Sequence, residues 1–194
     1  MDQLSFFSAE ARRPRVADLA GLLCGPGQAV GFGRGTAARL SVVVLDHWRA
    51  HALVAACGER GIDAEIDRSE EGHPLVRTAF RSDLTELAGQ WLRGAVKSVP
   101  RGFTPDGSTL RIWALTAGRV DPAGYLLGLD PHAEDTHEPL ERALARSGLP
   151  ARFVGARAGG PGLRVVGKRR IARLAELVGP TPVGAIERTW PWVS

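Results

Sequence analysis

Ser41-Val42-Val43-Val44-Leu45-Asp46 and Gly124-Tyr125-Leu126-Leu127-Gly128-Leu129-Asp130 are two apolar runs that each end in an aspartate. Each run is followed by a helical stretch, a glycine, a strand, a turn, a second strand and a further helix. The two aspartates are 84 positions apart, and the glycines that end the following helices, Gly61 and Gly148, are 87 apart. The sequence therefore predicts an internal repeat of about 85 residues with one three-residue insertion.

The repeat predicts an α+β fold (α/β in the broad sense) in which two pseudo-repeated αββαββα units carry antiparallel sheets. In the first unit we expect Asp46 to cap a helix with its carboxylate. The second unit has no clear counterpart of the first unit's short first strand. We expect the chain to divide into a basic N-terminal arm, a first unit, a linker, a second unit and a tryptophan-containing tail. These parts cover residues 1–15, 16–97, 98–107, 108–180 and 181–194.

The composition favours a globular protein outside the membrane. With 44% apolar residues among 194, the chain can bury a core, and no apolar run reaches the ~18 residues of a membrane span. The first residues lack the basic start and long apolar stretch of a signal peptide, so we expect a cytoplasmic protein. Cys24 and Cys57 lie in predicted helices without metal-type spacing, which predicts buried thiols.

Charge is unevenly distributed along the second half of the sequence. Residues 142–173 contain nine basic residues and no acid, whereas residues 121–141 contain six acids and no base. A basic segment of this kind favours a polyanionic partner, and DNA is the partner we expect. The acidic segment offers a docking surface for a protein partner.

One helix carries a family resemblance. Leu19-Ala20-Gly21-Leu22-Leu23-Cys24-Gly25-Pro26-Gly27 resembles the helix that names the LAGLIDADG homing endonucleases. The doubled order of elements resembles the single-chain pseudo-dimers of that family, and still more the degenerate LAGLIDADG domain of WhiA-type sporulation regulators. In the second half, residues 112–119 are similar to the corresponding WhiA segment. The resemblance implies that two such helices pack face to face while the sheets form a saddle on DNA.

The acids that cleavage requires are missing from the matching positions. The family resemblance implies one acid at the foot of each helix, where the pair holds divalent metal between the scissile phosphates. Pro26 stands at the first position, Gly118 and Arg119 stand near the second, and Asp121 is out of register. The resemblance therefore implies a cleavage-dead, non-enzymatic member without catalytic residues or a cofactor. The resemblance does not extend to the helix-turn-helix that follows this domain in WhiA regulators, so we do not expect the sequence-specific promoter recognition of those regulators.

Strand alternation assembles a basic face in the second unit. Arg164, Val166 and Lys168 share one face, and Arg152 lies on the partner strand. In the first unit Asp63, Glu65 and Asp67 share a strand face, so we expect a lopsided footprint on DNA that is dominated by phosphate contacts and weakly sequence-selective. The candidate nucleic-acid contacts are Arg34, Arg39, Arg152, Arg157, Arg164, Lys168, Arg169 and Arg170.

Two other functions remain open from the sequence. Strand-helix-strand-strand-helix units also build tandem ferredoxin-like domains that sense small molecules at their interface. A pure protein-interaction module would dock through residues 121–141 or through the C-terminal tail, where Trp190 and Trp192 favour a strap laid on the surface.

Two groups of histidines are candidates for metal binding. His47 and His51 have a spacing that can hold zinc, but no glutamate stands beside His47. His132, Asp135 and His137 are the better group, although a polar loop that leads into a helix explains the same residues. We therefore predict no metal site.

Overall fold

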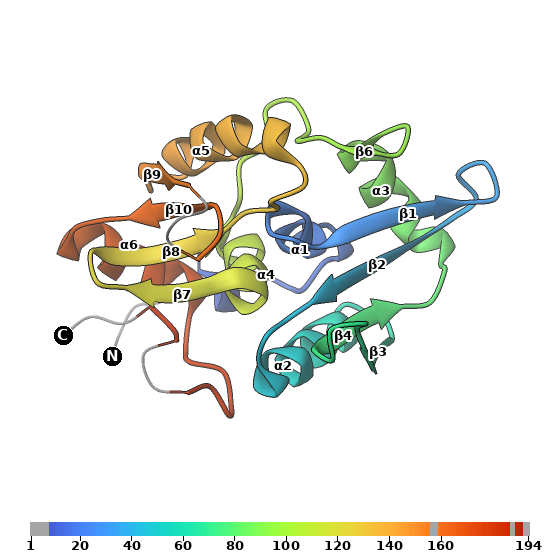
Figure 1. Ribbon diagram of the computed structural model, residues 1–194, viewed down its shortest axis with the longest axis horizontal. Coiled ribbons are helices and arrows are strands. Elements are labelled where there is room, and N and C mark those ends of the chain that lie inside the picture. Colours follow the sequence, from blue (N-terminus) through green and yellow to red (C-terminus); the bar gives the residue numbers. More distant parts are fainter. Residues whose placement is uncertain (1–7, 156–158, 187–188, 192–194) are drawn as a thin grey trace.

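The computed structural model describes residues 8–155, 159–186 and 189–191 (Figure 1). After η1 (Ala9–Ala11), the first unit consists of η2 (Val16–Leu19), α1 (Ala20–Cys24), β1 (Gln28–Phe32), β2 (Ala37–Val43), α2 (His47–Gly58), β3 (Ala64–Arg68), β4 (Pro74–Thr78), η3 (Ser82–Leu84) and α3 (Thr85–Trp91). The second unit consists of α4 (Gly107–Ala117), β7 (Gly118–Asp121), β8 (Gly124–Gly128), η4 (Glu134–Thr136), α5 (His137–Arg146), β9 (Ala151–Val154), β10 (Gly162–Val165) and α6 (Lys168–Val178). A short hairpin, β5 (Leu92–Arg93) with β6 (Val96–Lys97), ends the first unit. The predicted doubling of an αββαββα unit is confirmed.

The two large sheets have the same topology. Their strand orders are β1-β2-β4-β3 and β7-β8-β10-β9, and every neighbouring pair is antiparallel. A ferredoxin-like unit has the order β-α-β-β-α-β, in which the fourth strand of the sheet follows the second helix. Here the fourth strand is β1 or β7, which precedes both helices and forms a hairpin with β2 or β8, so that alternative does not describe this fold.

The strand β7 corrects the prediction that the second unit lacks a first strand. It pairs with β8 from Gly118 opposite Leu127 to Asp121 opposite Gly124. The sequence concealed it because β7 begins directly after the last residue of α4, with no turn residues between them, and because it has only four residues.

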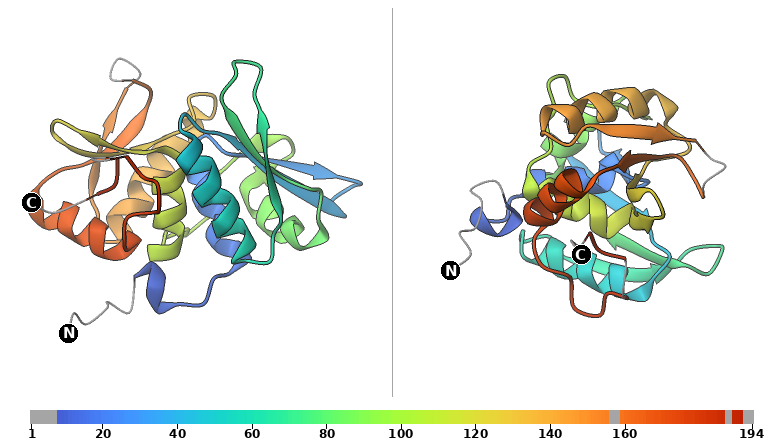
Figure 2. Two further views of the ribbon diagram at one scale, coloured as in Figure 1. Left: turned by 90° about the horizontal axis from the view of Figure 1, so that it is seen from below. Right: turned by 90° about the vertical axis from the view of Figure 1, so that its left-hand side faces the viewer.

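Helices α1 and α4 pack face to face at the junction of the two units (Figure 1). Gly21 permits the contact: a Cβ atom built there would lie 2.6 Å from the Cβ of Ile112 and 2.7 Å from the backbone nitrogen of Trp113. Seen from below, both sheets lie on one side of these central helices, and the β3–β4 and β9–β10 hairpins project away from them (Figure 2, left). Each sheet thus has one face toward the helices and one outer face.

One hydrophobic core runs through both units. Trp91 of the first unit and Trp113 and Tyr125 of the second belong to the same cluster of fully buried side chains. The predicted burial of both cysteines is confirmed, and burial raises the pKa of Cys57 to about 11. The two units therefore share their interior rather than standing as separate domains.

Asp46 precedes α2 but does not cap it as predicted. Its carboxylate makes no hydrogen bond to the first-turn amides and instead accepts a hydrogen bond from Nε of Arg49 at 3.0 Å. The guanidinium, one turn along the helix, competes successfully with the backbone donors for the carboxylate.

The described part of the C-terminal tail contacts both units: a Cβ atom built on Gly184 would lie 3.6 Å from the Cβ of Trp48 in α2, and Trp190 packs against the second unit. Trp190 is buried, its Nε1 donates to the carbonyl of Gly179 at 2.9 Å, and the guanidinium carbon of Arg111 lies 5.1 Å from its ring centroid. Trp192 is outside the described residues. Among the helices that the structure describes, none is long and apolar enough to cross a membrane.

Candidate nucleic-acid interface

The outer face of the second sheet carries a row of arginines. In β10, Leu163 and Val165 are buried against the helices, so Arg164 between them points outward. Arg164 lies opposite Arg152 of β9 and opposite Leu126 of β8, and Leu126 in turn lies opposite Arg119 of β7. Three arginines from three strands therefore share one row of the sheet, with Leu126 buried beneath them.

A cavity of about 350 Å³ opens beside this row. It is lined by Arg152, Arg164 and Arg170, the last of these from the first turn of α6, together with Pro150, Ala151 and Val166. Arg164 is neutralised by Asp121, with 2.9 Å between Nε and Oδ1. A hydrogen bond from the backbone N–H of Ala123, and after it Arg164, lower the pKa of Asp121.

The other two arginines that line this cavity are not neutralised by any acid that the structure describes. Within the described part of the chain, Arg152 and Arg170 form no ion pair, and Arg170 makes one long hydrogen bond of 3.4 Å to the carbonyl of Val166. Lys168 and Arg169 are exposed in the same first turn of α6. Since cations at a helix N-terminus oppose the helix dipole, this arrangement suits an external anion.

The sequence-predicted site residues fall into two groups. Arg152, Arg164, Lys168, Arg169 and Arg170 gather at the second sheet, whereas the two candidates of the first unit lie on the first sheet and its turn. Arg157 lies outside the described residues.

The candidates of the first unit are differently placed. Arg34 is exposed in the β1–β2 turn with a φ of +58°, and Arg39 of β2 lies with its guanidinium carbon 4.8 Å from the ring centroid of Phe80. The predicted acidic strand face is present in β3, where Asp67 pairs with Arg77 of β4 at 2.9 Å. The basic surface of the first unit is thus interrupted by acids.

Arg119 is the site residue that sequence reasoning missed. The sequence predicts that Arg119 lies at the end of a helix, and without β7 it belongs to no strand face. Only the sheet register places Arg119 in the same row as Arg164, since both lie opposite Leu126.

The feet of both central helices are held by buried cations. At the end of α1, Nζ of Lys97 donates to the carbonyl of Gly25 at 2.9 Å and lies 2.7 Å from Oδ2 of Asp130. Gln28 donates to the same carboxylate at 2.6 Å. Burial lowers the pKa of Lys97. Burial raises the pKa of Asp130, but Lys97, the N–H of His132 and Gln28 together hold it below its usual value.

At the end of α4 the cation comes from the other unit. Arg49 of α2 is buried, and its Nη1 donates to the carbonyls of Ala114 and Leu115 at 3.0 Å each, while Nη2 donates to Gly118 at 2.5 Å. These carbonyls are those that a helix leaves without internal partners at its end. Arg49 therefore caps α4 and neutralises the negative end of its dipole.

These helix feet do not fit a divalent metal. The expected acid positions hold Pro26, Gly118 and Arg119. The acids that the structure describes near the two helix ends are each paired with a cation: Asp130 with Lys97, Asp46 with Arg49 and Asp121 with Arg164. Two cations, Lys97 and Arg49, already bind the carbonyls there. Across residues 8–155, 159–186 and 189–191, no three His, Cys, Asp or Glu side chains are grouped to hold a metal ion.

The His132–His137 segment is used internally. His137 forms a hydrogen bond of 2.8 Å through Nε2 with the carbonyl of Asp130, and its ring stacks on Phe153 at 5.5 Å. The N–H of His132 donates to Asp130. Of the acids in residues 121–141, Glu138 also pairs with Arg142.

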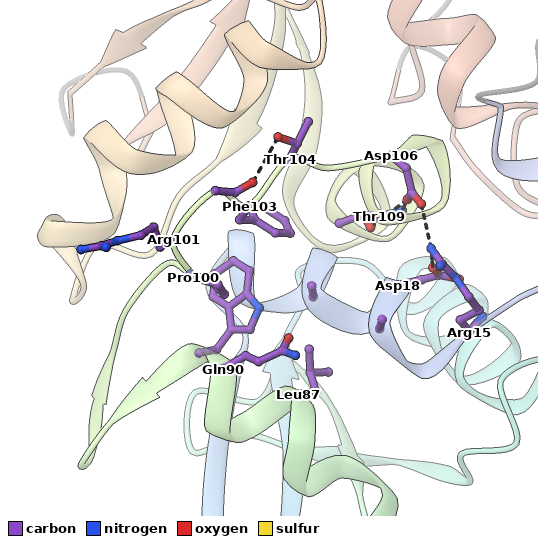
Figure 3. Close-up of a pocket in the computed structure, with 14 residues that line it drawn as sticks. Arg15, Asp18, Leu87, Gln90, Pro100, Arg101, Phe103, Thr104, Asp106 and Thr109 are labelled. Atoms are coloured by element: carbon purple, nitrogen blue, oxygen red, sulfur yellow. Dashed lines mark hydrogen bonds and ion pairs between the residues drawn. The ribbon is translucent and has the colours of Figure 1, made fainter.

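A cavity of about 500 Å³ lies at the N-terminal ends of η2–α1 and of α4 (Figure 3). Its polar side chains are already paired: Arg15 donates to Asp106 at 3.0 Å, Asp106 caps α4 through Thr109, and Asp18 pairs with Arg60. The Arg101 side chain points away from the other lining residues (Figure 3). These contacts join the two units and pair Arg15, Asp18 and Asp106 with charges of opposite sign.

The architecture is that of the LAGLIDADG class: two four-stranded antiparallel sheets in repeated units around two central helices. The solved structure of the homing endonuclease I-WcaI bound to its DNA recognition sequence matches with a TM-score of 0.60 and 14% identity, over 95% of this chain and 85% of that one. The N-terminal LAGLIDADG domain of DUF199/WhiA matches with a TM-score of 0.56 and 16% identity, over 92% of this chain and 88% of that one. The predicted resemblance is thus confirmed for the fold. Neither models of protein families nor curated protein sequences match this sequence.

Proposed function

We propose that this chain binds duplex DNA through the outer faces of its sheets, without cleaving it, and acts in regulation. The observation that carries the proposal is the Arg119–Arg164–Arg152 row beside a cavity that Arg170 also lines. A matching fold has been solved on DNA, in I-WcaI. Arginines on a sheet face supply phosphate contacts, which position a protein on DNA and carry little sequence information.

Neutralising two cations of the cavity tests the interface. We expect the double substitution Arg152→Ala and Arg170→Ala to weaken binding of a labelled duplex at least about tenfold at low salt, because each lost cation removes a phosphate contact. Fluorescence anisotropy measures the affinity. Arg142→Ala is the matched control, since Arg142 is exposed on α5 and pairs with Glu138 at 3.1 Å. An equal loss in the control would show that only net charge matters.

The absence of cleavage follows from the occupied helix feet. We expect purified protein to leave supercoiled plasmid intact in the presence of Mg²⁺, because Lys97 and Arg49 stand where the metal would need acids. We also expect Pro26→Ala to leave DNA affinity unchanged within about twofold, since Pro26 makes no part of the basic surface. Metal-dependent nicking that survives further purification would refute the non-enzymatic assignment.

A further inference from the structure

An aromatic pair stands exposed at the first sheet. Phe32 at the end of β1 is 64% exposed and Phe80, two residues after β4, is 41% exposed. Their ring centroids are 5.3 Å apart with the planes tilted by 46°. A group of large apolar side chains that is exposed to solvent indicates a binding surface.

Arginines border these rings. The guanidinium of Arg39 lies over Phe80, and its Nε is shielded from water without a hydrogen-bond partner among the described residues. Arg34 is exposed in the turn that follows Phe32. The aromatic surface therefore has a positive border, which suits a ligand attached to phosphate.

A cavity of about 320 Å³ lies against the face of this cluster. Phe80 and Arg39 line it on one side, and Asp63, Glu65 and Arg77 line it on the other. Arg77 is paired with Asp67, whereas Glu65 forms no ion pair with any residue that the structure describes. The cavity thus combines an aromatic ring, guanidinium donors and a carboxylate acceptor.

This mixture of groups selects among ligands. A phosphate is repelled by Asp63 and Glu65, and a cationic peptide side chain is repelled by Arg39 and Arg77. An aliphatic side chain would leave the carboxylate of Glu65 desolvated without a donor. A neutral heterocycle that stacks on a ring, donates N–H to a carboxylate and accepts from a guanidinium satisfies every group.

We propose that this cavity binds a single unpaired nucleobase whose exocyclic amine donates to the carboxylate of Glu65; among the pyrimidines of DNA, cytosine carries such an amine. The inference rests on the proposed nucleic-acid binding and adds to it a recognition of unstacked bases. Single strands and splayed bases are recognised in this way, through stacking on aromatic rings and hydrogen bonds to their edges. Paired bases stay inside the duplex and cannot enter.

The test compares two labelled single strands of about twelve nucleotides, oligodeoxycytidine and oligothymidine, by fluorescence anisotropy at pH 7.5. Cytosine has an amino group at the 4-position and an unprotonated N3, whereas thymine has a carbonyl, an N3–H and a 5-methyl group. We expect tighter binding of oligodeoxycytidine, a loss of about tenfold with Phe80→Ala, and loss of the preference with Glu65→Gln. Phe153→Ala is the matched control, because Phe153 stacks on His137 and lies on the helix side of the second sheet.

The duplex probe separates the two proposals. If the single strands bind as well to Phe80→Ala as to the wild type, or do not bind while the duplex does, the base pocket is refuted and the duplex interface stands. If neither probe binds, both proposals fail. Self-association in analytical ultracentrifugation that Phe32→Ala abolishes would assign the aromatic pair to a second copy of the chain instead. Thermal melting of each variant shows that it is folded.

Discussion

Replacing Arg49 by alanine is expected to lower the free energy of unfolding by about 3–5 kcal/mol. The guanidinium donates to three carbonyls at the end of α4 and pairs with Asp46, and the residue is only 6% exposed. Alanine would leave those carbonyls without a donor and without water. Because Arg49 belongs to the first unit and the carbonyls to the second, the loss falls on the contact between the units.

Urea denaturation followed by circular dichroism measures this change. Arg49→Lys should restore only part of the stability, since one ammonium cannot reproduce the planar fork. Arg142→Ala, which removes an exposed pair with Glu138, should change the free energy by less than about 1 kcal/mol. A loss at Arg49 no larger than that at Arg142 would mean that the helix end is solvated rather than capped.

Gly21→Ala is expected to destabilise the protein by about 3 kcal/mol, although alanine is the better helix former. By propensity alone the substitution would stabilise a helix by about 1 kcal/mol. Here the new methyl would lie 2.6 Å from Ile112 Cβ and 2.7 Å from the backbone of Trp113, and backbone atoms cannot move aside. The steric cost therefore reverses the sign.

Gly89→Ala is the control for this reversal. Gly89 lies inside α3, and a Cβ atom there would meet nothing within 4 Å. Its substitution should raise the free energy of unfolding by up to about 1 kcal/mol. Opposite signs at Gly21 and Gly89 in the same denaturation series would establish that α1 and α4 touch backbone to backbone. Stabilisation at both positions would exclude this contact.

Much of the fold could be predicted from the sequence because the same order of helices and strands occurs twice in it. The segment from Lys168 to Val178 was predicted as a helix and forms α6 with those bounds. Regular alternation in β10 placed Arg164 outward correctly. Such features depend on local periodicity, which a single sequence displays.

The features that could not be predicted from the sequence depend on contacts between residues that are far apart in the chain. Arg49 was one of many arginines, and its carbonyl partners lie 65 to 69 residues away. The same holds for Lys97, which reaches Gly25 across 72 residues. The pairing of Phe32 with Phe80 requires strands β1, β2 and β4 to be adjacent. Sequence patterns do not show which of many basic side chains are buried.

The salt dependence of duplex binding by the wild-type chain tests the central claim most directly. Arg152, Lys168, Arg169 and Arg170 offer four cations to phosphates, so a plot of log affinity against log salt concentration should fall with a slope of about −3 to −4. Anisotropy of a labelled duplex between about 50 and 200 mM salt provides the plot. A slope near zero, or no binding at the lowest salt, would contradict the proposal that these four cations bind DNA.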